Sequence, residues 1–103
     1  MILARLIGVR WGGVTEHTLT IEEEYTYGDK VTVNNNNITS PYTLQDGDVI
    51  KVPTSTTTTI NGTSYAIGDE SVLIITNEDI VITRTGGEKT FDTVPFIRIS
   101  YTT

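Results

Sequence analysis

The residues of this chain that could take part in acid–base or metal chemistry are carboxylates in similar short turns. Asp46 and Asp48 flank Gly47, while Asp69 and Asp79 each come shortly before an apolar run. Paired carboxylates could serve as the acid and base of a glycosidase. Aspartate is also common in turns because its side chain bonds to nearby backbone amides, and this role accounts for all four residues. We therefore predict no catalytic residue among them.

The same carboxylates are the only candidates for a metal site in the sequence. The Asp46-Gly47-Asp48 stretch lacks the spacing of an EF-hand loop. A surface Ca²⁺ ion between two hairpin turns stays an alternative, because carboxylate oxygens are the ligands that Ca²⁺ prefers. Since the turn interpretation is sufficient, we predict that the chain holds no metal.

The sequence also lacks the residues that other kinds of catalysis require. The chain has one histidine, His17, no cysteine, and no Gly-x-Ser-x-Gly sequence. His17 stands just before an alternating stretch, which is typical of a histidine at the start of a strand. Glycine patterns that cradle phosphates or dinucleotides do not occur. We predict that the protein is not an enzyme and uses no cofactor.

Charge excludes further classes of function. The 103 residues carry a net charge of −6, and the seven lysines and arginines are spread along the chain. A phosphate backbone repels such a protein, so we expect no binding to nucleic acid. Arg5 and Arg10 interrupt the first apolar stretch, and no segment reaches the length of a membrane span. We expect a chain that is soluble in the cytoplasm before assembly and is not bound to membranes.

Composition and periodicity predict an all-β fold. Only 19% of the residues are charged, and Thr, Asn and Gly supply much of the remainder. Apolar and polar residues alternate over 18–25 and over 97–102, and Asn61-Gly62 is a strong signal for a hairpin. The turn-and-strand spacing predicts one domain over 1–103, a β-sandwich or flattened barrel of about 8–10 short antiparallel strands.

Three stretches lead to more specific expectations. An acidic turn followed by an apolar run occurs at Asp46–Val52 and recurs at 28–33, 68–75 and 78–82. Val72–Ile75 is apolar throughout, which predicts a strand buried on both faces. Thr54–Thr59 is rich in hydroxyl groups, and both a linker and an exposed strand are consistent with it.

The two ends of the chain are candidates for contacts between subunits. Ile2–Trp11 is apolar on both strand faces, so it needs cover on two sides, either as the central strand of its own sandwich or from a partner. A small domain without cysteine often gains stability by oligomerisation, and we expect a homo-oligomer. The predicted interface residues come from both ends of the chain: Ile2, Leu3, Leu6, Ile7, Trp11, Phe96, Ile97, Ile99 and Tyr101.

Aromatic residues suggest a second kind of surface. Exposed tyrosines could stack on sugar rings, and Tyr42 and Tyr65 are the predicted glycan contacts. Packing in a core or an interface explains the same residues.

Two stretches, NNNNITSPYTLQDGDVIKV and TTTTINGTSY, resemble the Asn- and Thr-rich hairpins of small bacteriophage virion proteins, such as head-decoration and fibre β-domains. The resemblance covers 31–85. It implies a structural protein on the outer surface of a virus particle, with capsid or tail subunits as partners and no catalytic residues. The expected function is capsid decoration or cementing by subunit packing. A carbohydrate-binding or adhesive β-sandwich and a tail or baseplate connector are the alternatives.

Overall fold

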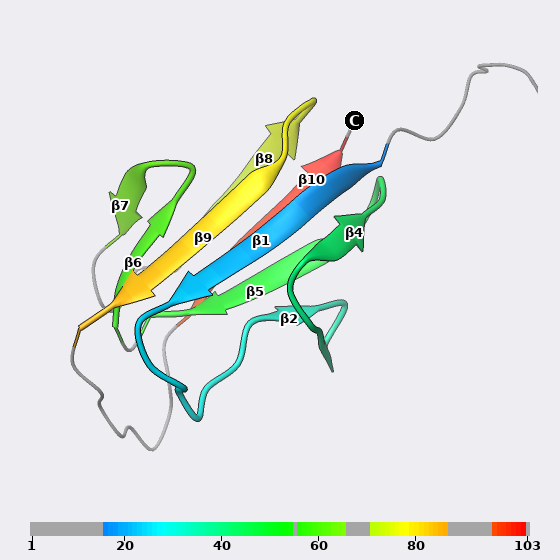
Figure 1. Ribbon diagram of the computed structural model, residues 1–103. Helices are drawn as coiled ribbons and strands as arrows, with labels where there is room; N and C mark the ends of the chain where they lie inside the picture. The colour runs from blue at the N-terminus through cyan, green and yellow to red at the C-terminus, as the bar shows by residue number, and fades with distance from the viewer. Residues whose placement is uncertain (1–15, 55, 66–70, 87–95, 103) are drawn as a thin grey trace, which may run out of the picture.

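The structure is a computed structural model that describes residues 16–54, 56–65, 71–86 and 96–102. It confirms the all-β prediction, because the described residues form ten strands and no helix (Figure 1). The strands are β1 (His17–Glu23), β2 (Thr32–Val33), β3 (Asn36–Asn37), β4 (Tyr42–Leu44), β5 (Val49–Pro53), β6 (Thr57–Ile60), β7 (Thr63–Tyr65), β8 (Val72–Thr76), β9 (Ile80–Thr85) and β10 (Phe96–Thr102).

The strands form two five-stranded sheets that pack face to face. One sheet has the order β4-β1-β9-β6-β7 and the other the order β3-β2-β5-β10-β8. In Figure 1, β1 and β9 lie in front of β10 and β8. The expectation of antiparallel pairing alone is wrong, because β1 runs parallel to β9 and β10 runs parallel to β8. Both sheets are therefore mixed.

Period-two alternation directs one face of each central strand into the space between the sheets. Leu19 on β1 and Ile82 on β9 meet Ile50 on β5 and Ile99 on β10 there, and all four side chains are fully buried. Burial of each such side chain contributes about 1.5–3 kcal/mol to folding. The core between the two sheets thus provides most of the stability of the domain.

The threonine-rich run is neither a linker nor an exposed strand. Thr54, Thr56 and Thr58 are buried. Thr58 belongs to β6, and its side chain lies on the buried face of that strand. The Thr58 hydroxyl donates to the carbonyl of Thr56 at 3.3 Å, so part of its polarity is satisfied locally. The run enters the core because β-branched threonine packs well on a pleated sheet once its hydroxyl has a partner.

The apolar run of β8 is not buried on both faces. β8 is the edge strand of its sheet, and Val72 and Ile74 are 59% and 66% exposed, whereas Leu73 and Ile75 pack against the core. The run is continuous in the sequence, but alternate side chains point to opposite faces of the sheet, and only the face with Leu73 and Ile75 packs against the core.

Two hairpins turn at asparagines with left-handed backbone, Asn34 with φ 53° and Asn61 with φ 49°. The Asn34 amide donates to the Val49 carbonyl at 2.8 Å, and its side-chain oxygen accepts from the Val49 amide at 3.0 Å. Asn61 makes the same two contacts with Val81, at 2.9 and 2.7 Å. Each asparagine therefore extends the ladder from its hairpin to a central strand. The recurring sequence pattern corresponds to a structural repeat in which β2–β5 and β6–β9 are equivalent.

We predict that Asn34→Ala lowers the free energy of unfolding more than Asn35→Ala does. Both residues have left-handed backbone, but the Asn34 side chain bonds to Val49 and to Asp48, and the Asn35 side chain bonds to none of the described residues. The difference between the variants should be about 1 kcal/mol or more. Urea unfolding of the two variants measures it, and equal losses would show that the backbone conformation alone matters.

Candidate functional site

A fully buried arginine holds one end of the sandwich together. Arg84 lies on the inward face of β9, and its Nη2 is 3.0 Å from Oδ1 of Asp29 while its Nη1 is 3.4 Å from Oε1 of Glu23. Its Nη1 also donates to the Asp29 carbonyl at 3.0 Å, and its Nε donates to the Thr56 hydroxyl at 3.3 Å. A buried guanidinium without such partners would cost several kcal/mol, so these contacts determine where the β1–β2 connection lies.

An aromatic ring completes the surroundings of this arginine. The Arg84 guanidinium lies 4.7 Å from the centre of the Tyr27 ring, and the Tyr27 hydroxyl donates to the Gly86 carbonyl at 3.0 Å. Burial, together with the charge of Glu24, raises the pKa of Tyr27 above its ordinary value. Tyr27 is therefore neutral at physiological pH, and its hydroxyl is engaged by the Gly86 carbonyl.

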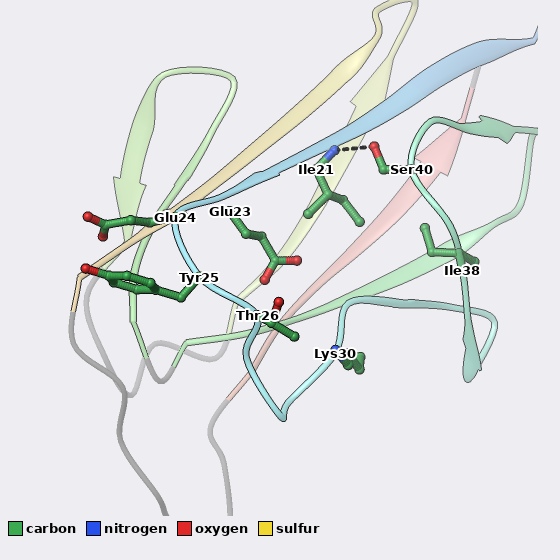
Figure 2. A pocket seen from close by; sticks show the side chains of 8 residues that line it. All are labelled: Ile21, Glu23, Glu24, Tyr25, Thr26, Lys30, Ile38 and Ser40. Carbon is green, nitrogen blue, oxygen red and sulfur yellow. Dashed lines mark hydrogen bonds between the residues drawn. The ribbon is translucent and has the colours of Figure 1, made fainter.

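A groove of about 560 Å³ lies next to this cluster, between the end of β1 and the segment that leads into β4 (Figure 2). The side chain of Ile21 forms one wall, and the Ser40 hydroxyl on the opposite wall accepts a hydrogen bond from the Ile21 amide at 2.9 Å. The lining residues are Ile21, Glu23, Glu24, Tyr25, Thr26, Lys30, Ile38 and Ser40.

The carboxylates of this groove are already engaged in structural contacts. Glu23 pairs with Arg84, and Oε1 of Glu24 accepts a hydrogen bond from the Gly86 amide at 2.7 Å. Figure 2 shows the Glu24 and Glu23 carboxylates directed to different sides of the β1–β2 connection. Tyr25, at 60% exposure, leaves an accessible aromatic face beside them. This arrangement suits contact with a polar ligand such as a sugar better than acid–base catalysis by a facing carboxylate pair.

Of the other acidic candidates, Asp48 acts as a turn residue, as the sequence indicated, whereas Asp79 bonds to the start of β1. The Asp48 carboxylate accepts from the Gln45 amide at 2.9 Å and from the Asn34 side chain at 3.0 Å. The Asp79 carboxylate accepts from the Thr18 amide at 3.0 Å and lies 3.4 Å from Nδ1 of His17. Asp69 lies outside the described residues. Among those that are described, no group of three His, Cys, Asp or Glu side chains is arranged to hold a metal ion.

The free edge of β8 is the main apolar feature of the described surface. Val72 and Ile74 point outward from this edge strand, and Val72 shares a shallow depression of about 100 Å³ with Ser71, Phe96 and Arg98. The residues of β8 carry no charge. An uncharged edge with apolar outward residues is a ready template for pairing with another strand.

The predicted interface residues fall into three groups. Ile97, Ile99 and Tyr101 are fully buried in the core of this chain, so in the folded subunit they do not reach a partner. They are buried because β10 lies between β5 and β8 with these residues on its inward face. Phe96 lies on the outer face, 5.1 Å from the Lys51 ammonium. The remaining candidates lie outside the described residues: Ile2, Leu3, Leu6, Ile7 and Trp11.

Tyr101 has a structural role that the sequence did not predict. Its hydroxyl donates to the Glu78 carbonyl at 2.6 Å, and its ring centre is 5.3 Å from that of His17. Burial raises the pKa of Tyr101. The tyrosine thus links β10 to the turn between β8 and β9.

The two predicted glycan contacts do not form one surface. Tyr42 lies on β4 and Tyr65 on β7, which are the opposite edges of the same sheet. Both rings are half-buried and pack against the core. Tyr25, which is not one of the two predicted glycan contacts, is the exposed tyrosine beside the groove.

No family model, no curated protein and no solved structure matches the chain. In the part of the chain that is described, no helix is long and apolar enough to cross a membrane.

We predict that Arg84→Met destabilises the domain by about 3–5 kcal/mol, because it leaves Glu23 and Asp29 without their buried cation. Arg98→Met is the matched control, since Arg98 is exposed on β10, and it should stay within about 0.5 kcal/mol of the unmodified protein. Urea unfolding followed by circular dichroism measures both. Equal stability of the two variants would contradict the structural role of Arg84.

Proposed function

We propose that this chain is a non-enzymatic structural protein that acts by packing against neighbouring subunits through the edge of β8. The observation that carries the proposal is the exposure of Val72 and Ile74 on an uncharged edge strand. Natural proteins usually protect sheet edges with charged residues, bulges or very short strands. An edge without such protection is best explained by a partner that covers it.

The other described edges support this interpretation by contrast. The edge strands β4 and β7 have three residues each and β3 has two, whereas β8 has five. The edge strand β3 is made of two exposed asparagines. Short or polar edges discourage pairing between molecules. Of the four described edges, the one formed by β8 is therefore the best suited to pairing with another molecule.

The proposed setting is a bacteriophage particle, in which the chain decorates or cements the head from outside. The hairpins over 31–85 support this setting by their resemblance to virion β-domains, and the net charge of −6 fits a position away from packaged nucleic acid. A tail or baseplate connector would differ only in its partner. Mass spectrometry of purified particles tests the setting, and absence of peptides from this chain would contradict it.

We predict that Ile74→Lys reduces self-association or binding to capsid subunits by roughly tenfold or more, because it places a charge in an apolar contact. Folding should be unaffected, since Ile74 is exposed. Val81→Lys is the matched control, because Val81 is an apolar residue with 37% exposure on the other sheet. Light scattering over a range of concentrations measures the native mass, alone and with purified capsid subunits.

Two results would contradict the proposal. If the unmodified protein stays monomeric at every concentration and binds no capsid or tail subunit, the β8 edge has no partner. If Ile74→Lys and Val81→Lys reduce association equally, the effect comes from charge in general and not from this edge.

A second candidate function is carbohydrate binding at the groove, favoured by the exposed ring of Tyr25 beside polar side chains. We predict in that case that Tyr25→Ala abolishes binding to a glycan array, because stacking on an aromatic face supplies much of the affinity for sugars. Tyr65→Ala is the control, since Tyr65 is half-buried on the far edge of the sheet. An array without any bound glycan would remove this candidate.

A further inference from the structure

We infer that the free edge of β8 accepts residues Ile2–Trp11 of a neighbouring copy as an added strand. This inference rests on the proposed function, since it names the partner that covers the edge. The strand that would cover the edge is a segment of the same sequence that belongs to another subunit.

The edge is suited to strand addition by its backbone and by its side chains. β8 pairs with β10 in parallel from Arg98–Val72 to Thr102–Thr76, and no described strand pairs with its other edge. Backbone groups along that edge are therefore available to another strand. The outward row of Val72 and Ile74 would continue onto the added strand as one apolar surface.

The segment Ile2–Trp11 has the matching properties in the sequence. Apolar residues occupy both of its faces, so one face can continue the inward row of Leu73 and Ile75 while the other continues the outward row of Val72 and Ile74. With ten residues, it is longer than the five-residue β8, so pairing can extend along the whole edge. It contains no proline, so each amide is able to donate to the ladder.

Charge also favours this occupant. Arg5 and Arg10 are the charged residues of the segment, and residues 1–15 contain no acidic residue. The remainder of the chain keeps five of the seven cations and all thirteen acids, which gives it a formal charge of −8. Glu78 and Asp79 directly follow β8 at one end of the edge. The cationic segment is therefore attracted to the anionic remainder of another copy, whereas the anionic parts of two copies repel each other.

The geometry favours a neighbouring copy over the same chain. β1 begins at His17, whose Nδ1 is 3.4 Å from Asp79 and whose ring is 5.3 Å from Tyr101 on β10. The start of β1 thus lies on the side of β8 that β10 already occupies (Figure 1). Five residues, Gly12–Glu16, link the segment to β1, and they span at most about 17 Å. A segment from a neighbouring copy is not subject to this limit of length.

The resulting contact joins two different surfaces, the segment of one copy and the β8 edge of the next. Such head-to-tail contacts produce closed rings when the rotation between copies closes, and filaments otherwise. Either product allows many copies to be linked over the surface of a larger assembly, which is the behaviour that the proposed function requires.

Cross-linking between single-cysteine variants tests the inference, because the natural chain contains no cysteine. Leu6→Cys and Ile7→Cys together sample both faces of the segment, and Ile74→Cys marks the edge. Each segment variant is mixed with the edge variant, treated with a short bismaleimide and analysed by mass spectrometry of the linked peptides. Val81→Cys replaces Ile74→Cys as the control, since Val81 is also exposed but lies on the opposite sheet.

The expected result is a link between chains from the segment to Ile74→Cys, at least tenfold more abundant than the link to Val81→Cys. A double variant, Ile7→Cys with Ile74→Cys, that links mainly within one chain at high dilution would overturn the inference. An oligomer of normal mass without the link between chains would overturn it too, while the proposed function stands. A monomer at all concentrations that binds no capsid or tail subunit would overturn both.

Discussion

The buried guanidinium of Arg84 is the interaction on which the described structure most depends. A cation enclosed between two sheets is stable only when opposite charges and hydrogen-bond acceptors surround it. Glu23 at the end of β1 and Asp29 in the connection that follows supply those charges, and Tyr27 covers the guanidinium plane. The requirement to satisfy one side chain thus fixes the course of the β1–β2 connection. The groove at Glu23–Lys30 exists because this connection folds over the end of the sandwich.

The remaining architecture follows from a repeated unit. Each half of the repeat consists of a hairpin, an asparagine that extends the hairpin to a central strand, and an acidic turn before that strand. The two halves place β5 and β9 at the centres of the two sheets, while β1 and β10 add the parallel pairings. The halves differ in the strands before their acidic turns, since β4 has three residues and ends in the buried Leu44, whereas β8 has five residues and a strongly exposed apolar face. This asymmetry connects the fold to the proposed role in assembly.

Local patterns predicted much of the fold. Alternation identified β1 and β10, and Asn61-Gly62 identified the β6–β7 turn, because these signals depend on neighbours in sequence. The burial of Arg84 was missed, although its even spacing after Ile80 and Ile82 places it on the inward face. The exposure of Val72 and the parallel pairing of β8 could not be predicted, because they depend on which strand lies beside it. The burial of Ile97, Ile99 and Tyr101 has the same cause, since an apolar strand face packs equally well on its own core and on a partner.

The most direct test of the account is hydrogen–deuterium exchange of the β8 amides that face away from β10, measured at low and high protein concentration. If neighbouring subunits cover this edge, these amides exchange quickly in dilute solution and become protected as assembly proceeds, while amides of the central strand β9 are protected throughout. The contradicting result is exchange at β8 that does not change with concentration while the native mass rises. Assembly would then use another surface.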